Sequence, residues 1–218
     1  MPRRPMLFAF AVVLLLAANV SAADQDGWVS LFDGKTLTGW KQRNGTATYR
    51  VEKGTIVGRT KEGSPNSFLC TTKSYGDFEL TFEVKVDDAL NSGVQIRSAS
   101  KKDVNNYRVH GPQVEIATNG TAGFIYGEAL GTGWLSDKAK VEKGTKAFKN
   151  GEWNKYRVLA RGNRIQTWIN GTPVADTIDK KSKMKSGFIG LQVHGIRKGT
   201  GPYEVRWRNI RLRELSKK

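Results

Sequence analysis

The chain has 218 residues and a formal net charge of +16, with 36 lysines and arginines against 20 acidic residues. A basic chain favours anionic partners such as nucleic acids, acidic glycans or an envelope surface. Here the basic residues are spread along the whole sequence without a nucleic-acid-binding motif, so we expect no nucleic acid partner. The single cysteine, Cys70, excludes an intramolecular disulfide, and its place in an apolar run predicts a small packed residue, not a nucleophile.

The N-terminus has the three parts of a secretory signal peptide. A basic start, Pro2-Arg3-Arg4, precedes a 13-residue apolar run and the small-residue cleavage site Val20-Ser21-Ala22. A membrane anchor is the alternative, but a bilayer-spanning helix needs about 20 apolar residues. We therefore predict a signal peptide over 1–22 and export to the periplasm or the medium. A single mature domain over 23–218, without a transmembrane segment, follows.

The mature sequence predicts strands and no convincing helix. Turn residues recur roughly every 8 to 12 residues, which is typical of a β-sandwich or barrel. The expected strands span 28–32, 48–52, 55–59, 67–71, 78–86, 92–98, 111–116, 123–127, 153–160, 164–169, 187–194 and 203–212. Asn170-Gly171 predicts a tight hairpin turn from the strand 164–169 into a further strand at Pro173-Val174. Alternation slips near Arg208-Asn209, which predicts a β-bulge. The expected fold is an all-β antiparallel β-sandwich.

The clearest alternation lies in the run 78–86. Its even positions are apolar, so side chains such as Phe82 should face the core, and odd positions such as Thr81 should face outward. Burial of its five apolar side chains should contribute on the order of 8–14 kcal/mol before entropy is counted.

Several of the predicted strands share one apolar and one polar side. If they lie side by side, one polar surface gathers the side chains Gln95, Arg97, Gln113, Glu115, Gln192 and His194. The ordinary interpretation of such a surface is a solvated outer face of an antiparallel sheet. Its amides, arginine, acid and histidine, edged by glycines, equally suit a binding or catalytic site.

The long segment between Tyr126 and Trp153 predicts a lid or a binding loop. Trp134 stands among glycines and either stacks on a sugar or folds back over the edge of the core. We include Tyr126 and Trp134 among the candidate substrate contacts.

The acidic residues disfavour glycoside hydrolysis by paired carboxylates, which lie ~5–9.5 Å apart in such enzymes. The candidate strand offers only Glu115, followed by Ile116-Ala117, so a second carboxylate would have to come from elsewhere, from Glu79, Glu83 or Glu128. Only two histidines are present, His110 and His194, in neither HxH nor HExxH spacing. No cofactor is predicted, and a mixed His/Glu/Gln site for a divalent metal stays open. A base, a histidine and amides suit either proton abstraction beside a carbonyl or the binding of sugar hydroxyls.

Several ordered motifs resemble the 3-keto-disaccharide hydrolase domain family. They are Trp28 to Trp40 (WVSLFDGKTLTGW), Tyr75 to Leu80 (YGDFEL), Asn91 to Val94 (NSGV), Gly111 to Ile116 (GPQVEI), Gly151 to Asn154 (GEWN) and Gly190 to Gly195 (GLQVHG). The resemblance covers nearly the whole mature chain. It implies a concanavalin A-like jelly roll and the cleavage of glycosides already oxidised to a ketone at sugar C3. Such a ketone acidifies the C2 proton, so that one base suffices.

The leading hypothesis is therefore an exported enzyme that acts on 3-keto-glycosides by elimination and hydration. Glu115 would be the base and His194 an acid or second base, with Arg97, Gln95, Gln113 and Gln192 as substrate contacts. The alternative is a non-catalytic carbohydrate-binding module of the same fold. A structural envelope protein is a third possibility. In the first two hypotheses the partner is a carbohydrate.

Overall fold

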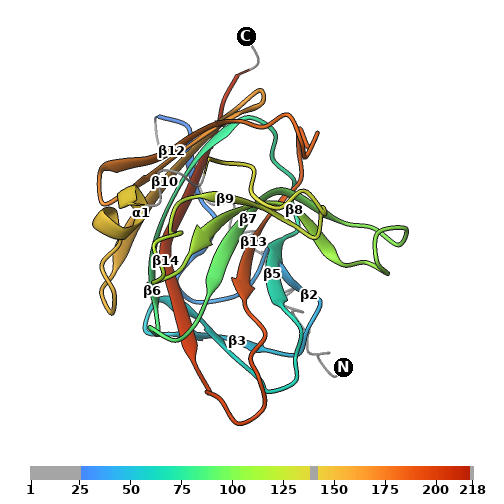
Figure 1. Cartoon of the computed structure of the whole chain (residues 1–218), viewed down its shortest axis with the longest axis vertical. Coiled ribbons are helices and arrows are strands. Elements are labelled where there is room, and N and C mark those ends of the chain that lie inside the picture. The colour runs from blue at the N-terminus through green and yellow to red at the C-terminus, as the bar shows by residue number, and fades with distance from the viewer. Residues whose placement is uncertain (1–25, 138–141, 217–218) are drawn as a thin grey trace, which may run out of the picture.

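Two antiparallel sheets pack face to face in the computed structural model, which describes residues 26–137 and 142–216 (Figure 1). The larger, eight-stranded sheet has the order β12 (Thr172–Ile178), β11 (Arg164–Ile169), β10 (Asn154–Arg161), β6 (Phe78–Val86), β14 (Glu204–Glu214), β4 (Thr55–Arg59) and β3 (Thr48–Glu52), with β1 (Trp28–Ser30) pairing β14. The six-stranded sheet has the order β2 (Trp40–Arg43), β5 (Ser67–Thr71), β13 (Phe188–Val193), β7 (Ser92–Ser100), β8 (Val109–Ile116) and β9 (Ile125–Glu128). The predicted antiparallel β-sandwich is confirmed.

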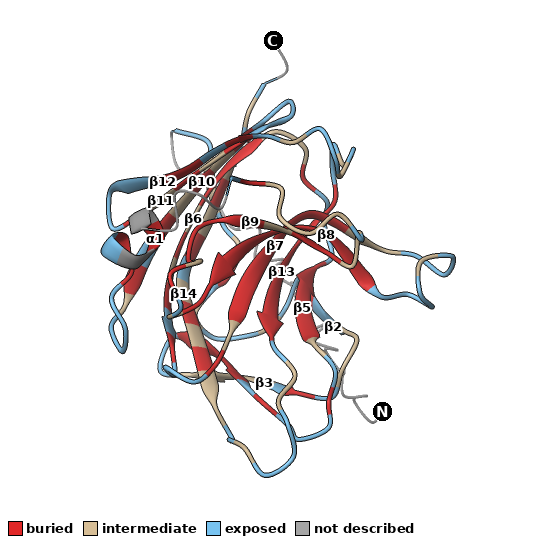
Figure 2. Ribbon diagram, viewed as in Figure 1, coloured by how far each residue is buried: buried red, intermediate tan, exposed pale blue. Residues whose placement is uncertain are grey.

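The core lies between the sheets and follows the alternation of the strands. Along β6 the even positions are buried, with Phe82 2% exposed, whereas Thr81 and Lys85 are at least partly exposed. Trp207 of β14 is fully buried beside this strand, and β13, β7 and β8 supply the facing apolar side chains. Figure 2 shows that the central strands of both sheets are largely buried.

The bulge predicted near Arg208-Asn209 is confirmed. The pairing of β14 with β6 shifts register between Arg208 and Arg211, and Asn209 adopts a positive φ of 51°. The bulge lets Trp207 and Ile210 both face the core although their separation breaks strict alternation.

Two elements differ from the sequence prediction. Strand β2 was missed because Lys41, Gln42 and Arg43 carry no apolar alternation, and β2 lies at a sheet edge where such alternation is not required. The segment expected to be irregular contains a short helix, α1 (Glu142–Ala147), which packs against β12. Six residues with a central glycine are too few to show a helical period.

The predicted signal peptide lies outside the described residues and stays a prediction. Among the residues that the structure describes, no helix has the length and hydrophobicity to cross a bilayer.

Candidate active site

The outward side of the six-stranded sheet carries a cluster that we call the glutamine face: Gln95, Gln113, Gln192 and Glu115. Strand pairing sets their arrangement, because Gln95 lies opposite Gln113 on one side and Gly190 on the other. In the neighbouring row, Gly93 lies between Gln192 and Glu115. Four polar side chains thus surround two glycines on the adjacent strands β13, β7 and β8.

Because they lack Cβ atoms, the two glycines leave room on this face for the glutamine side chains. A Cβ atom at Gly93 would lie 2.6 Å from Cγ and Cδ of Gln113, so that side chain lies over the glycine. A Cβ atom at Gly190 would lie 3.2 Å from Sγ of Cys70 and 3.3 Å from Cβ of Gln95. Larger residues at either position would displace the glutamines.

Each glutamine of this face has a buried polar atom without a hydrogen-bond partner in the described part of the chain. These atoms are Nε2 of Gln95, Nε2 of Gln113 and Oε1 of Gln192. Buried polar atoms are nearly always bonded, and an unbonded one costs about 1–3 kcal/mol. Two unbonded donors and one unbonded acceptor therefore lie together on adjacent strands, on side chains that are at most 1% exposed. A polar ligand that entered this face would satisfy them.

Glu115 is the acid of this face and is 5% exposed. Burial raises the pKa of its carboxyl group to about 7, with a further upward influence from Glu128, while a hydrogen bond from Asn91 Nδ2 (3.1 Å) opposes the shift. The backbone is fixed as well: the carbonyl of Glu115 accepts from Gly123 N at 2.9 Å and from Oη of Tyr156, in the opposite sheet, at 3.3 Å. A carboxyl group with a pKa near neutrality suits a general base.

A second acid, Glu128, lies on the same side of the sheet. It pairs in register with Gly111, four residues from Glu115, which corresponds to roughly 13 Å along the strand. Its carboxylate accepts a hydrogen bond from Arg108 at 3.2 Å. This offset and the ion pair make Glu128 an electrostatic neighbour of Glu115 and do not place it as a paired catalytic acid.

His194 lies just beyond the end of β13 and is exposed, with Nδ1 2.7 Å from the carbonyl oxygen of Gly195. It lines a hollow of about 490 Å³ together with Asn44, Asn66, Phe68 and Arg108. Phe68 pairs in register with Gln192, so this hollow opens at the edge of the glutamine face. Two strand spacings, roughly 10 Å, separate Glu115 from the strand that carries His194.

The structure places Arg97 elsewhere. Its register with the neighbouring strands is interrupted by a bulge after Gln95, and its φ is +48°. The guanidinium donates to the carbonyls of Gly76 (2.7 Å) and Gly162 (2.6 Å) and to the carboxylate of Asp77 (2.8 Å). Its prediction as a member of the polar surface is wrong, because the bulge turns a side chain that strict alternation would place beside Gln95.

Tyr126 and Trp134 contact each other edge-on, with ring centroids 5.3 Å apart. Tyr126 pairs in register with Gln113 and is partly exposed, so it lies at the border of the glutamine face. Trp134 packs against the hydrophobic core, as in the second of the two interpretations of this residue. Cys70 is fully buried and its pKa is raised to about 12 by burial, which confirms a packed thiol.

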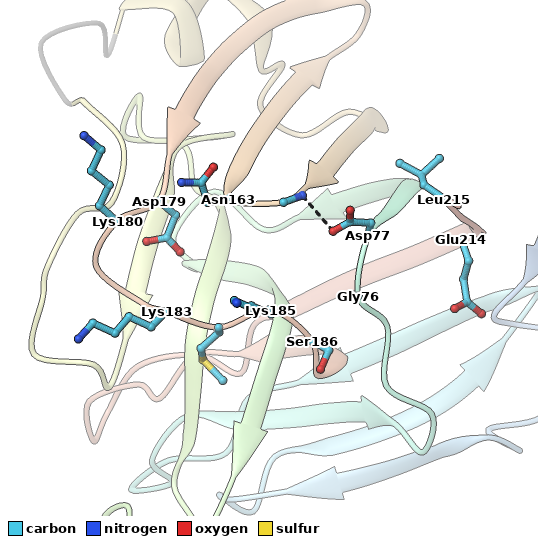
Figure 3. Close-up of a pocket in the computed structure, with 12 residues that line it drawn as sticks. Gly76, Asp77, Asn163, Asp179, Lys180, Lys183, Lys185, Ser186, Glu214 and Leu215 are labelled. Atoms are coloured by element: carbon cyan, nitrogen blue, oxygen red, sulfur yellow. Dashed lines mark hydrogen bonds between the residues drawn. The ribbon is translucent and has the colours of Figure 1, made fainter. Parts of the chain in front are cut away.

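A hollow of about 960 Å³ lies at another edge of the molecule (Figure 3). Asp179, Lys180 and Lys183 lie on one side of it and Glu214 and Leu215 on the other. Its three acids are engaged in structural contacts. Asp77 accepts from Gly162 N and Arg97, Asp179 accepts from the backbone amides of Lys181 and Ser182, and Glu214 forms an ion pair with Lys73. We therefore locate the candidate active site at the glutamine face and the hollow of about 490 Å³ beside it, which His194 lines.

Three contributors to the site escaped sequence reasoning: Asn91, Phe68 and Arg108. Asn91 belongs to the NSGV motif and directly precedes β7, the strand that pairs with Glu115. This position in the sequence could have indicated that Asn91 lies near Glu115, to which it donates a hydrogen bond. Phe68 and Arg108 reach the site only through strand pairing and a loop. Within the described ranges, no group of three or more His, Cys, Asp or Glu side chains is placed to hold a metal ion.

Residues 27–213 match the family described as 3-keto-alpha-glucoside-1,2-lyase-like domain. The chain belongs to this family. A relative named 3-keto-disaccharide hydrolase, from Bacteroides thetaiotaomicron, is 25% identical over 88% of this chain and 80% of its own length. The family resemblance predicted from the motifs is thereby confirmed.

Solved structures of similar fold include a candidate glycosyl hydrolase from Parabacteroides distasonis. Its TM-score is 0.61 at 22% identity, over 87% of this chain and 94% of that one. The carbohydrate-binding module CBM66 from Bacillus subtilis has a TM-score of 0.55 at 17% identity, over 81% and 96%. A Bacillus subtilis protein with a galectin-like fold has a TM-score of 0.61 at 9% identity, over 84% and 92%. These structures place the chain among jelly-roll folds.

Proposed function

We propose that this protein is an exported enzyme that cleaves 3-keto-glycosides on its glutamine face. The observation that carries the proposal is a buried Glu115, with a pKa of about 7, beside three glutamines with unpartnered amide atoms. A 3-keto-glycoside has a group for each of these functions. Its carbonyl oxygen accepts hydrogen bonds from the unbonded amide donors, and its acidic C2 proton can be removed by Glu115. Membership of the family and its 3-keto-disaccharide hydrolase relative support the choice of substrate class.

In the proposed reaction, the carboxylate of Glu115 removes the proton from C2. The electron pair of that C–H bond first forms an enolate with the C3 carbonyl. The amides of Gln95 and Gln113 donate to the enolate oxygen, where a donor is worth most because charge develops there. The C1–O bond then breaks with formation of the C1=C2 double bond, and the leaving oxygen takes a proton.

His194 is the candidate donor of that proton. It borders the hollow beside Gln192, where the leaving group would extend. Water then adds across the C1=C2 bond, with hydroxyl to C1 and a proton to C2, and yields the free 3-keto sugar. Net hydrolysis therefore needs one carboxylate base and no second catalytic carboxylate.

The direct test is incubation of the mature protein with an aryl 3-keto-glucoside and with its unoxidised parent, each with and without a divalent metal. Release of the aryl alcohol from the ketone alone is the expected result. Release from both compounds at similar rates contradicts elimination through C2. N-terminal sequencing of protein recovered from outside the cytoplasm should begin at residue 23 and tests export.

The competing function is a carbohydrate-binding module without activity. The unpartnered amides favour it as a specific observation, because sugar hydroxyls would satisfy them equally well. Absence of cleavage together with measurable binding of the parent glucoside would establish this alternative.

A further inference from the structure

The outer face of the larger sheet carries an excess of positive charge far from the glutamine face. Strands β6, β10 and β14 lie side by side at its centre, and their outward positions follow the alternation. Cations outnumber carboxylates there: Lys85, Lys155, Arg157, Arg161, Arg206, Arg208, Arg211 and Arg213 against Glu79, Glu83 and Glu204. Such a surface concentrates anions near it.

A hollow of about 510 Å³ lies within this face. Thr81 lines the hollow, in register with Arg157 on β10 and with Arg211 on β14. Lys155, Trp168 and Glu83 also line the hollow, and the carboxylate of Glu83 accepts hydrogen bonds from Arg208 Nε at 2.8 Å and from Asn209 Nδ2 at 3.1 Å. A small neutral side chain thus stands between two arginines, with a lysine and a tryptophan alongside.

Neighbouring contacts hold the arginine side chains in place. The guanidinium of Arg157 stacks on Trp168 with its Cζ 4.1 Å from the ring centroid, and Arg208 stacks on Trp153 at the same distance. Arg157 Nε and Arg213 Nη2 both donate to the single carboxylate of Glu79, at 2.5 and 2.6 Å. Two arginines that share one carboxylate leave positive charge for a further anion.

We propose that this hollow binds an acidic polysaccharide, one that bears uronate or sulfate groups. Arginine and lysine would pair with the anionic groups, and the ring edge of Trp168 would contact a neighbouring sugar. A lipid surface fits less well, because peripheral membrane binding relies on protruding apolar side chains. The exposed large hydrophobic residues among those described, Tyr107 and Ile178, do not line this hollow.

The test measures the affinity of the mature protein for oligogalacturonate of defined length, with a neutral cello-oligosaccharide of equal length as the reference. Thr81→Glu places a carboxylate between the two arginines, and Lys155→Gln removes one cation of the hollow. Lys198→Gln, at an exposed loop residue, changes the net charge by the same single unit. The neutral oligosaccharide should not compete with the oligogalacturonate.

We expect a loss of at least about tenfold for Thr81→Glu, a smaller loss for Lys155→Gln and less than about twofold for Lys198→Gln. Equal losses in all three variants would reduce the binding to net charge and overturn the proposal, as would the absence of binding. A Thr81-dependent affinity for anionic phosphatidylglycerol vesicles or a single-stranded oligonucleotide, without one for oligogalacturonate, would also overturn it. Thr81→Glu should retain wild-type cleavage of the aryl 3-keto-glucoside, so failure of the proposed reaction and failure of this surface are separate outcomes. If Thr81→Glu does not fold, the exposed Lys155→Gln carries the comparison.

Discussion

Glu115 occupies a setting that favours its protonated form up to about neutral pH. Its ordinary pKa of 4.5 is raised to about 7, chiefly by burial, so the folded protein holds this proton more tightly than the unfolded chain. The associated stability is fully present below about pH 4.5 and is lost as the pH rises through 7. Ionisation of Glu115 above about pH 7 therefore lowers the stability of the folded protein, and the proposed role as a base requires this ionised form.

Glu115→Gln removes that titration and should therefore stabilise the protein selectively at higher pH. Relative to wild type, the variant should gain on the order of 3 kcal/mol in the free energy of unfolding between pH 4.5 and 7.5. Urea denaturation at a series of pH values measures the difference, with Glu62→Gln, at an exposed residue, as the control. A difference that stays constant across the range would show that Glu115 is not held protonated by burial.

The glutamines should likewise serve binding more than stability. Gln113→Met keeps the length of the side chain and removes a buried amide without a partner at Nε2. Since an unpaired buried donor costs about 1–3 kcal/mol, the melting temperature should be unchanged or higher, while substrate affinity falls. Calorimetry of unfolding and of ligand binding checks both halves, and a marked loss of stability with full affinity would assign Gln113 a structural role.

At the scale of single elements, strand β7 shows where alternation stops being a guide. Up to Gln95 the odd positions face outward as expected, and beyond it the bulge sends Arg97 to the β5–β6 loop and the β10–β11 turn. The glycines, amides and Glu115 could be assigned to one surface because each lies on a regular stretch of strand. Arg97, β2 and α1 could not be assigned, because bulges, edge strands and single helical turns leave little trace in the pattern of polar residues.

Arg97→Ala should act on folding. It removes the partner of Asp77 and the donors to two carbonyls from a side chain that is 1% exposed, so a loss of about 3–5 kcal/mol is expected. Where the variant folds, its KM and kcat for the 3-keto-glucoside should stay close to wild type. If the variant has wild-type stability and a raised KM, Arg97 is a substrate contact and the structural role assigned to it is wrong.

Strand β6 offers the matched comparison for the core. Phe82→Asp places an unpaired charge among buried side chains and should cost several kcal/mol, on the order of 3 or more, whereas Thr81→Asp lies outward between arginines and should be mild. Thermal unfolding of the two variants gives the answer. Similar melting temperatures would mean that the two faces of β6 are reversed.

At the scale of the whole molecule, the two sheets have different roles in the candidate site. The smaller sheet carries the glutamine face, and the larger sheet fixes it from behind through Tyr156, which stacks on Phe82 at 4.9 Å and donates to the carbonyl of Glu115. The hydrogen bond between Tyr156 and Glu115 joins residues far apart in the sequence, so no local sequence pattern predicts it. The fold class followed from local alternation, whereas the neighbours of Glu115 depend on the pairing order of distant strands.

The most direct test of the account is kcat of Glu115→Gln on an aryl 3-keto-glucoside at saturating concentration. The amide keeps the shape and the hydrogen-bonding capacity of the carboxyl group but does not accept the C2 proton. A positioned base contributes ~10²–10⁴-fold, so kcat should fall by at least that order with little change in affinity, and wild-type kcat should rise with pH through about 7. A Glu115→Gln protein that turns over at a near wild-type rate would contradict the assignment of Glu115 as the base.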